Sequence, residues 1–354
     1  MVRKGEKIEM ITTVCGEIPK EALGNVLPHE HLLIDLKVFT KKPAGDPGVF
    51  YQKLSLDNLR FVRKDPYSIL DNAVMDEEEV ARHEVELFGR AGGNTIVDAT
   101  LDSIGRDPLA LKRISESTGV HIVMGCGFYV AAAHPKGLAE RSEKELAAEM
   151  VRDIREGVRG TGVRAGVIGE IGTSAVVTPE EWKCVAAAGL AHLETGKAIH
   201  VHTSLYETNG ITIAEKLLAM GVAPSKIAID HIDVDIREDY IERLLDFGVF
   251  VEFDNFGKEF YISKREGETL NGRFAYDLER AETVARLVGK GYAGQILLTN
   301  DICIKNMLCT YGGFGYAHIL ENIRPMLRDC GVREEDISRM ISDNAAIFLD
   351  DKNR

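Results

Sequence analysis

Short apolar, β-rich segments recur along the whole chain, and amphipathic helical patterns such as Ala81, Val85 and Phe88 fill the gaps between them. Eight such segments are present, at residues 26–35, 95–100, 121–129, 165–172, 198–204, 227–233, 250–257 and 295–302. Buried strands that alternate with crossover helices form parallel sheets, and eight such units close a barrel. The pattern therefore predicts a (β/α)₈ TIM barrel, with a doubly wound open α/β sheet as the alternative.

Three longer segments interrupt this repeat, at residues 37–75, 258–273 and 305–318. They are predicted to be loop insertions over the C-terminal face of the barrel. The third contains YGGFGY, whose glycines suit a tight turn or a mobile lid. Barrels of this kind often exceed the usual domain length, so a single domain over residues 1–354 is expected.

Composition narrows the classes of partner. A formal net charge of -13 opposes binding to nucleic acid or to anionic membrane surfaces. The chain also contains no apolar run near the roughly 18 residues that a membrane span needs. The six cysteines form no C-x-x-C pair, which indicates a reduced, cytoplasmic protein. A small-molecule substrate is the partner that these features favour.

Histidines and carboxylates lie late in the predicted strands. His29 and His31 are two residues apart, so their side chains face the same way and can reach one ion. Glu170 lies in the apolar segment AGVIGEIGTS, where an unpaired carboxylate would be costly to bury. Further candidates follow in later strands: His202, His231, Asp233 and Asp301, whereas His200 lies one layer deeper and is expected to be a core or supporting residue. Because the carboxyl ends of barrel strands meet at one mouth, these residues are expected to surround a metal site.

The ordered motifs PHEHLLID, GFY, AGVIGEIGTS, HVHTS, IDHID, TNDI and YGGFGY span nearly the whole sequence. Through them the chain resembles the phosphotriesterase family of the amidohydrolase superfamily, in particular its phosphotriesterase-related branch. The resemblance implies two divalent cations. A buried α ion would be bound by His29, His31 and Asp301, a more exposed β ion by His202 and His231, with Glu170 bridging the two. Imidazole and carboxylate ligands suit Zn²⁺, with Mn²⁺, Co²⁺ or Fe²⁺ as alternatives.

The sequence departs from the best-known members of this family at two positions. Those members bridge the ions with a carboxylated lysine, whereas this chain has Glu170, as the related branch does. Asn255 stands where organophosphate-hydrolysing members have a proton-relaying histidine. The second departure argues against efficient phosphotriester hydrolysis.

The resemblance implies a metal-dependent hydrolase in which a metal-bridging hydroxide attacks an ester, lactone, phosphoester or amide of a small molecule. Asp301 is the predicted catalytic base. Tyr129 is predicted to contact the substrate or its developing oxyanion, Asp254 faces the same mouth, and Arg273 and Lys305 lie in loops where they could bind an acidic group. Two alternatives stay open: a mononuclear deaminase or decarboxylase, and a non-catalytic metal-binding barrel. Related proteins suggest a homodimer.

Overall fold

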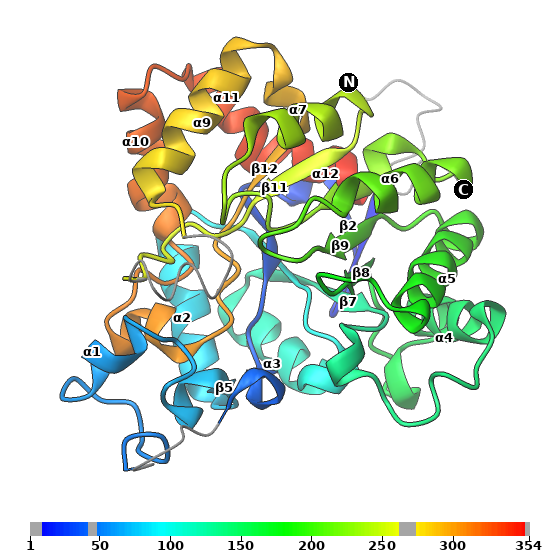
Figure 1. The fold of residues 1–354 in the computed structure, drawn as a ribbon, viewed down its shortest axis with the longest axis horizontal. Helices are drawn as coiled ribbons and strands as arrows, with labels where there is room; N and C mark the ends of the chain where they lie inside the picture. Colours follow the sequence, from blue (N-terminus) through cyan, green and yellow to red (C-terminus); the bar gives the residue numbers. More distant parts are fainter. Residues whose placement is uncertain (1–8, 42–47, 262–273, 351–354) are drawn as a thin grey trace.

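Eight parallel strands form the centre of the structure, a computed structural model that describes residues 9–41, 48–261 and 274–350 (Figure 1). They are β3 (Val26–Glu30), β6 (Thr95–Asp98), β7 (His121–Cys126), β8 (Val167–Gly172), β9 (Ile199–His202), β10 (Ile227–Ile229), β11 (Phe250–Phe253) and β12 (Ile296–Leu298). Each falls within one of the eight predicted segments. Sequential strands are neighbours throughout the sheet, so the predicted TIM barrel is confirmed.

The first and last strands, β3 and β12, meet through a side chain. Within the described residues, no backbone ladder joins these two strands. Instead, the buried carboxylate of Glu30 accepts hydrogen bonds from Thr299 Oγ1 at 2.6 Å and from the backbone N–H groups of Asn300 and Ile302 at 2.8 Å each. Glu30 thus closes the barrel at the seam between these two strands.

Helices surround the strands (Figure 1). The larger ones are α2 (Glu78–Arg90), α3 (Pro108–Thr118), α4 (Glu143–Arg155), α5 (Pro179–Thr195), α6 (Gly210–Ala219), α7 (Glu238–Asp246) and α9 (Asp277–Gly289). Local sequence sets their ends: Asp107 caps α3 and Gly119 ends it in a left-handed conformation. The shorter helices are α1 (Leu59–Val62), α10 (Arg324–Asp329), α11 (Glu334–Ser338) and α12 (Asn344–Leu349).

The first predicted strand, at residues 26–35, was too long. β3 ends at Glu30, and residues 34–35 form a separate short strand, β4 (Ile34–Asp35), which pairs antiparallel with β5 (Val74–Met75). Ile34 is buried in this second sheet, so its apolar character reflects packing of the first insertion rather than a longer barrel strand. An antiparallel hairpin, β1 (Met10–Thr13) and β2 (Gly16–Pro19), precedes the barrel.

Apolar side chains fill the end of the barrel where the strands begin. One buried cluster takes residues from all eight strand segments together with the hairpin and α12: Ile11, Val26, Val97, Val123, Val167, Ala198, Ala228, Phe250, Leu297 and Phe348. Polar residues gather at the other end, where the strands stop. This division leaves the carboxyl-terminal mouth as the place for chemistry.

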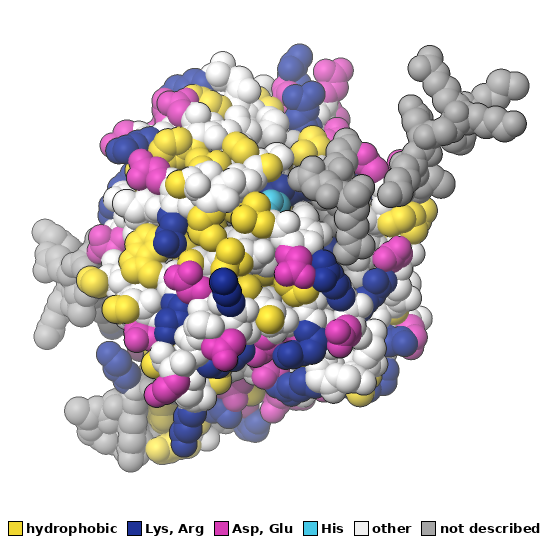
Figure 2. All heavy atoms as spheres, turned by 90° about the vertical axis from the view of Figure 1, so that its right-hand side faces the viewer, with side chains coloured by type: hydrophobic (Ala, Val, Ile, Leu, Met, Phe, Trp, Pro, Cys, Tyr) yellow, Lys and Arg dark blue, Asp and Glu magenta, His cyan; other side chains and the backbone are white. Residues whose placement is uncertain are grey.

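Acidic and basic side chains are interspersed over the face of the molecule shown in Figure 2, and little histidine surface is visible there. Six of the ten histidines are buried: His29, His31, His192, His200, His231 and His318. Among the described residues, no helix is both long and apolar enough to cross a membrane.

Candidate metal centre

The six predicted metal ligands converge at the mouth of the barrel around the carboxylate of Glu170. Its Oε1 lies 3.3 Å from His31 Nε2, and its Oε2 lies 3.6 Å from His29 Nε2. On the other side, Oε2 is 2.9 Å from His202 Nδ1 and 3.5 Å from His231 Nε2. One buried carboxylate therefore contacts two pairs of histidines that come from distant parts of the chain.

These contacts define two groups of ligand atoms that share Glu170. His29, His31 and Glu170 form the first group, and Glu170, His202 and His231 form the second; within each group the ligand atoms lie within 4.8 Å of one another. Asp301 Oδ1 extends the first group, at 3.1 Å from His31 Nε2 and 3.9 Å from His29 Nε2. The arrangement offers two adjacent ion positions joined by one carboxylate.

The donor set fits divalent ions. His29 Nε2 is fully buried and has no hydrogen-bond partner, although it points at two carboxylates. Metal bonds of about 2 Å place neighbouring ligand atoms roughly 3.3 Å apart, close to the separations found around Glu170. His202 Nδ1 and His231 Nε2 approach to 2.8 Å and both face the Glu170 carboxylate. Buried imidazole and carboxylate atoms directed at common points are suitable ligands for a transition-metal ion.

The backbone holds two of these ligands in unusual conformations. His231 and Asp301 have φ angles of 63° and 46°, and only one other non-glycine residue of the described chain, Arg159, has a positive φ. Such conformations cost free energy and cluster at functional sites, where surrounding contacts enforce them. Next to Glu170, Gly169 has a φ of 111°, and a Cβ there would lie 2.4 Å from the carbonyl oxygen of His200.

The outer nitrogen of each first-group histidine also has a partner. His29 Nδ1 lies 3.0 Å from Glu252 Oε2, and His31 Nδ1 lies 2.9 Å from Thr100 Oγ1. In the second group, His231 Nδ1 lies 3.1 Å from Asp254 Oδ2. The hydrogen bonds of His29 and His31 hold these two rings in orientations that direct their Nε2 atoms toward Glu170.

Lys258 contributes a cation that the sequence analysis did not identify. Its buried ammonium pairs with Asp301 Oδ2 and donates to Asn255 Oδ1 at 2.8 Å. The Asn255 amide in turn donates to Asp233 Oδ1 at 2.5 Å, and Arg280 Nε donates to Asp233 Oδ2 at 3.0 Å. Asp233 is therefore engaged by these two groups, and a buried polar network leads outward from Asp301.

Burial and charge act against each other in this network. Burial alone would raise the pKa of Asp301, but the positive charge of Lys258 and the hydrogen bond to His31 hold that pKa well below its usual range. Burial would lower the pKa of Lys258, but Asp301 raises it above its ordinary value. For Asp254, burial dominates and raises the pKa to about 7 although His231 lies beside it. The positive charge around Asp301 thus favours its ionised form.

The four predicted substrate contacts lie in different surroundings. The Tyr129 hydroxyl is 3.4 Å from His202 Nδ1, at the edge of the second ligand group. Asp254 contacts His231, as described above. The ammonium of Lys305 lies 3.2 Å from Asp71 Oδ1 and 3.0 Å from Glu77 Oε1, so two carboxylates already match its charge. Arg273 lies outside the described residues.

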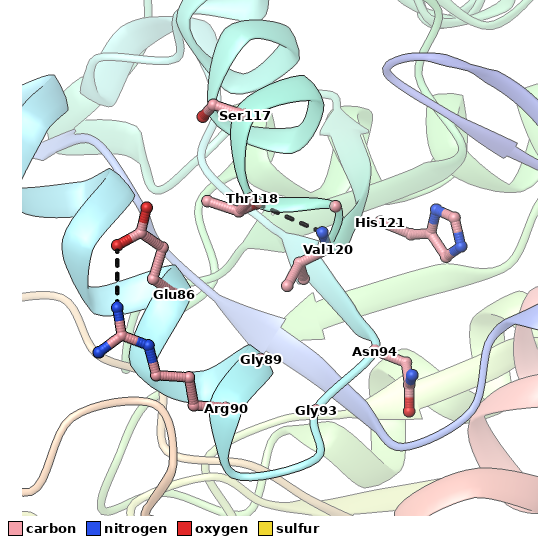
Figure 3. Close-up of a pocket in the computed structure, with 10 residues that line it drawn as sticks. Glu86, Gly89, Arg90, Gly93, Asn94, Ser117, Thr118, Val120 and His121 are labelled. Atoms are coloured by element: carbon pink, nitrogen blue, oxygen red, sulfur yellow. Dashed lines mark hydrogen bonds and ion pairs between the residues drawn. The ribbon is translucent and has the colours of Figure 1, made fainter.

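A surface hollow of about 420 Å³ lies elsewhere, where α2 and α3 end and β6 and β7 begin (Figure 3). Glu86, Arg90, Asn94 and His121 are among the residues that line it. None of the predicted ligands is among them. The strands begin at this end of the barrel, so the hollow is separate from the metal centre.

Sequence reasoning missed Glu252 and Lys258. Glu252 carried a usable signal, because it is a carboxylate in the apolar strand β11, just as Glu170 is in β8. Lys258 carried no comparable signal, since it lies in a charged loop where an exposed lysine is the ordinary expectation.

Comparison with known proteins agrees with this geometry. A model of the phosphotriesterase family matches residues 9–349. An N-acetyltaurine hydrolase from Salmo salar is 34% identical over 352 residues, which cover 96% of this chain and 97% of that protein. The crystal structure of a resiniferatoxin-binding protein from Rhodobacter sphaeroides superposes with a TM-score of 0.92 at 33% identity, covering 98% of this chain and 96% of that one. The phosphotriesterase homology protein from Escherichia coli, complexed with phosphate in its active site, gives a TM-score of 0.77 at 30% identity, with 93% and 99% coverage. The chain belongs to the phosphotriesterase family and is a hydrolase of that family.

Proposed function

We propose that this hydrolase binds two divalent ions, with Zn²⁺ as the first expectation and Mn²⁺, Co²⁺ or Fe²⁺ as alternatives. His29, His31 and Asp301 would hold one ion, His202 and His231 the other, and Glu170 both. The observation that carries this proposal is the sharing of Glu170 between two buried groups of ligand atoms. A mononuclear enzyme would leave one of these groups without a role.

The side chains around the proposed ions would have separate roles. Bound divalent ions would supply a deprotonated water at neutral pH and polarise the substrate carbonyl. Asp301 is ionised and can accept a proton at its carboxylate, while Lys258 holds that carboxylate in place. The Tyr129 hydroxyl, beside His202, can donate a hydrogen bond to the substrate oxygen that gains negative charge.

The bond that we propose first is the amide of a small N-acyl amino acid or N-acyl aminosulfonate. The name of the Salmo salar relative, which matches nearly the whole chain, supports this choice. Asn255 stands where organophosphate-hydrolysing members have the relay histidine, which also makes phosphotriesters weaker candidates for the substrate. Hydrolysis of carboxylic esters and lactones also begins with attack at a carbonyl carbon, so these compounds are the second group to test.

The test begins with protein purified without chelator, in which metals are counted by mass spectrometry. We expect two equivalents per chain in the wild type and a reduced count in His31→Asn. The matched control is His83→Asn, which removes an exposed histidine and is expected to keep both ions. One equivalent in the wild type would favour the mononuclear alternative, and none, with no activity restored by zinc, would reject the proposal.

Turnover is then measured on a panel of N-acyl amino acids, N-acyl aminosulfonates, lactones, carboxylic esters and phosphoesters. We expect the highest kcat/KM for an N-acyl substrate. A clear preference for lactones would support a hydrolase but would show that the bond it cleaves is an ester rather than an amide. Two bound ions with no turnover of any substrate would favour the non-catalytic alternative.

A further inference from the structure

Strand β11 provides no predicted metal ligand, yet it places two carboxylates inside the barrel. Glu252 lies in this strand and Asp254 directly follows it, both with an exposed fraction of 0%. Residues two apart on a strand face the same way, so both carboxylates point toward the barrel interior. Glu252 lies beside His29, and Asp254 lies beside His231 and within 4.0 Å of His29 Nδ1.

Glu252 is in contact with His29. Its Oε2 lies 3.0 Å from His29 Nδ1, while the opposite ring nitrogen, Nε2, faces Glu170 and Asp301 without a hydrogen bond. A carboxylate can only accept, so a hydrogen bond at this distance requires the proton to be on Nδ1. In the neutral ring, the lone pair is then on Nε2, the atom that faces the proposed ion position.

Asp254 lies within ion-pair distance of the His231 ring and is hydrogen-bonded to its backbone. Its Oδ2 accepts the backbone N–H of His231 at 2.8 Å and lies 3.1 Å from His231 Nδ1. His231 Nε2 again faces Glu170. The backbone hydrogen bond also helps to hold His231 in its left-handed conformation.

We infer that β11 supplies the positioning residues of the metal centre, with Glu252 fixing the ligand tautomer of His29 and Asp254 holding the backbone and ring of His231, one histidine for each ion. The inference rests on the proposed function. Ligand histidines commonly donate their second ring N–H to a carboxylate, which orients the ring and raises its basicity. His31 differs, because its outer nitrogen meets the hydroxyl of Thr100, which can either donate or accept.

The test uses Glu252→Gln and Asp254→Asn, which keep size but introduce an amide N–H that can donate to the ring and so favour the wrong tautomer. Ions are titrated into chelator-stripped protein in competition with a chromophoric chelator. We expect each variant to lose about 10- to 100-fold in affinity for one ion and to keep the other. Glu252→Asp, which restores a carboxylate, is expected to recover part of the affinity that Glu252→Gln loses.

Two further measurements distinguish a positioning role from a general loss of stability. Asp153→Asn removes a carboxylate that pairs with Arg106 outside the metal centre, and it is expected to change stability but neither ion affinity. ¹⁵N spectra of the metal-loaded protein are expected to show protonated Nδ1 on the three ligand rings whose Nε2 faces Glu170, those of His29, His31 and His231, and on one fewer in each variant.

The outcomes are distinct. Unchanged affinity for both ions in Glu252→Gln and Asp254→Asn, with a wild type that holds two, would overturn this inference and leave the proposed function intact. A third ion per chain would assign His29 Nδ1 to a site with His200, Asp230 and Glu252, and would also overturn it. A wild type that takes up no ion contradicts the proposed function itself.

Discussion

Lys258 and Asp301 form an ion pair that is nearly inaccessible to solvent, with side-chain exposures of 7% and 8%. The lysine neutralises the same carboxylate that the proposed α ion would bind. Asp301 would thus face two sources of positive charge, the lysine and the proposed ion. The first two predictions follow from this arrangement.

Asp301→Asn removes the proposed proton acceptor while keeping its shape. Asparagine tolerates the positive φ of this position, so the fold is expected to persist. We expect kcat to fall by about 10²- to 10⁴-fold, the usual contribution of a general base, with KM changed far less. Steady-state kinetics at saturating metal measures this, with the metal count as the control for occupancy. An unchanged kcat would remove Asp301 as the base.

Lys258→Met leaves the buried Asp301 carboxylate without its lysine. Removing one partner of a buried ion pair costs about 3–5 kcal/mol, so we expect a loss of this size in the metal-free protein. The loss is expected to be smaller when ions are bound, because they provide the missing positive charge. Urea unfolding of chelator-treated and metal-loaded protein compares the two states. Equal losses in both would show that Lys258 and the ions act independently.

Gly169→Ala places a Cβ against the carbonyl of His200, beside the bridging carboxylate. We expect a loss of about 1–3 kcal/mol in unfolding free energy from overpacking, together with a lower metal count. Gly160→Ala is the matched control, because Gly160 also has a positive φ, of 72°, but open space around its Cβ position. Chemical unfolding of both variants separates the steric effect from the backbone effect. Equal losses of unfolding free energy in the two variants would mean that the contact with His200 does not contribute to the effect of Gly169→Ala.

Asp350 anchors the end of the described chain between Lys20 and Lys226, at 2.8 Å from each ammonium. Burial alone would raise its pKa, but the two lysines hold that pKa below its ordinary value. The resulting stabilisation is therefore complete above the unfolded pKa near 3.9 and disappears as pH falls through the lower folded pKa. We expect Asp350→Asn to cost about 1.5–3 kcal/mol at pH 7, with a smaller difference from the wild type at pH 3. A penalty independent of pH, measured by urea unfolding, would contradict this.

The barrel could be predicted because its strands are buried on both faces and read as apolar runs. The ligand positions could be predicted because histidines and carboxylates are costly inside such runs without a partner. The same argument applied to Glu252 would have identified it, but its partner, His29, is 223 residues away in sequence. Only the closed barrel shows that Glu252 meets the outer nitrogen of that histidine.

Other features depend on tertiary contacts that no local pattern encodes. The end of β3 at Glu30 is set by bonds across the seam, and the apolar residues that follow pack into a different sheet. Lys258 and Lys305 both lie in predicted loop insertions, yet one contacts Asp301 and the other contacts Asp71 and Glu77. The loop conformation, rather than residue type, decides which lysine reaches the metal centre.

The seam between β3 and β12 also separates the residues that would bind the proposed α ion. On one side of the seam, His29 and His31 flank Glu30. On the other side, Asp301 lies between Asn300 and Ile302, and the backbone N–H groups of these two residues donate hydrogen bonds to Glu30. The spacing of these ligands therefore depends on the Glu30 carboxylate and on the hydrogen bond from Thr299 Oγ1 to the His29 carbonyl, rather than on a main-chain ladder. Replacement of Glu30 would leave buried donors of β12 and the following loop unpaired, and it would therefore act on the positions of His29, His31 and Asp301 without touching any of the three.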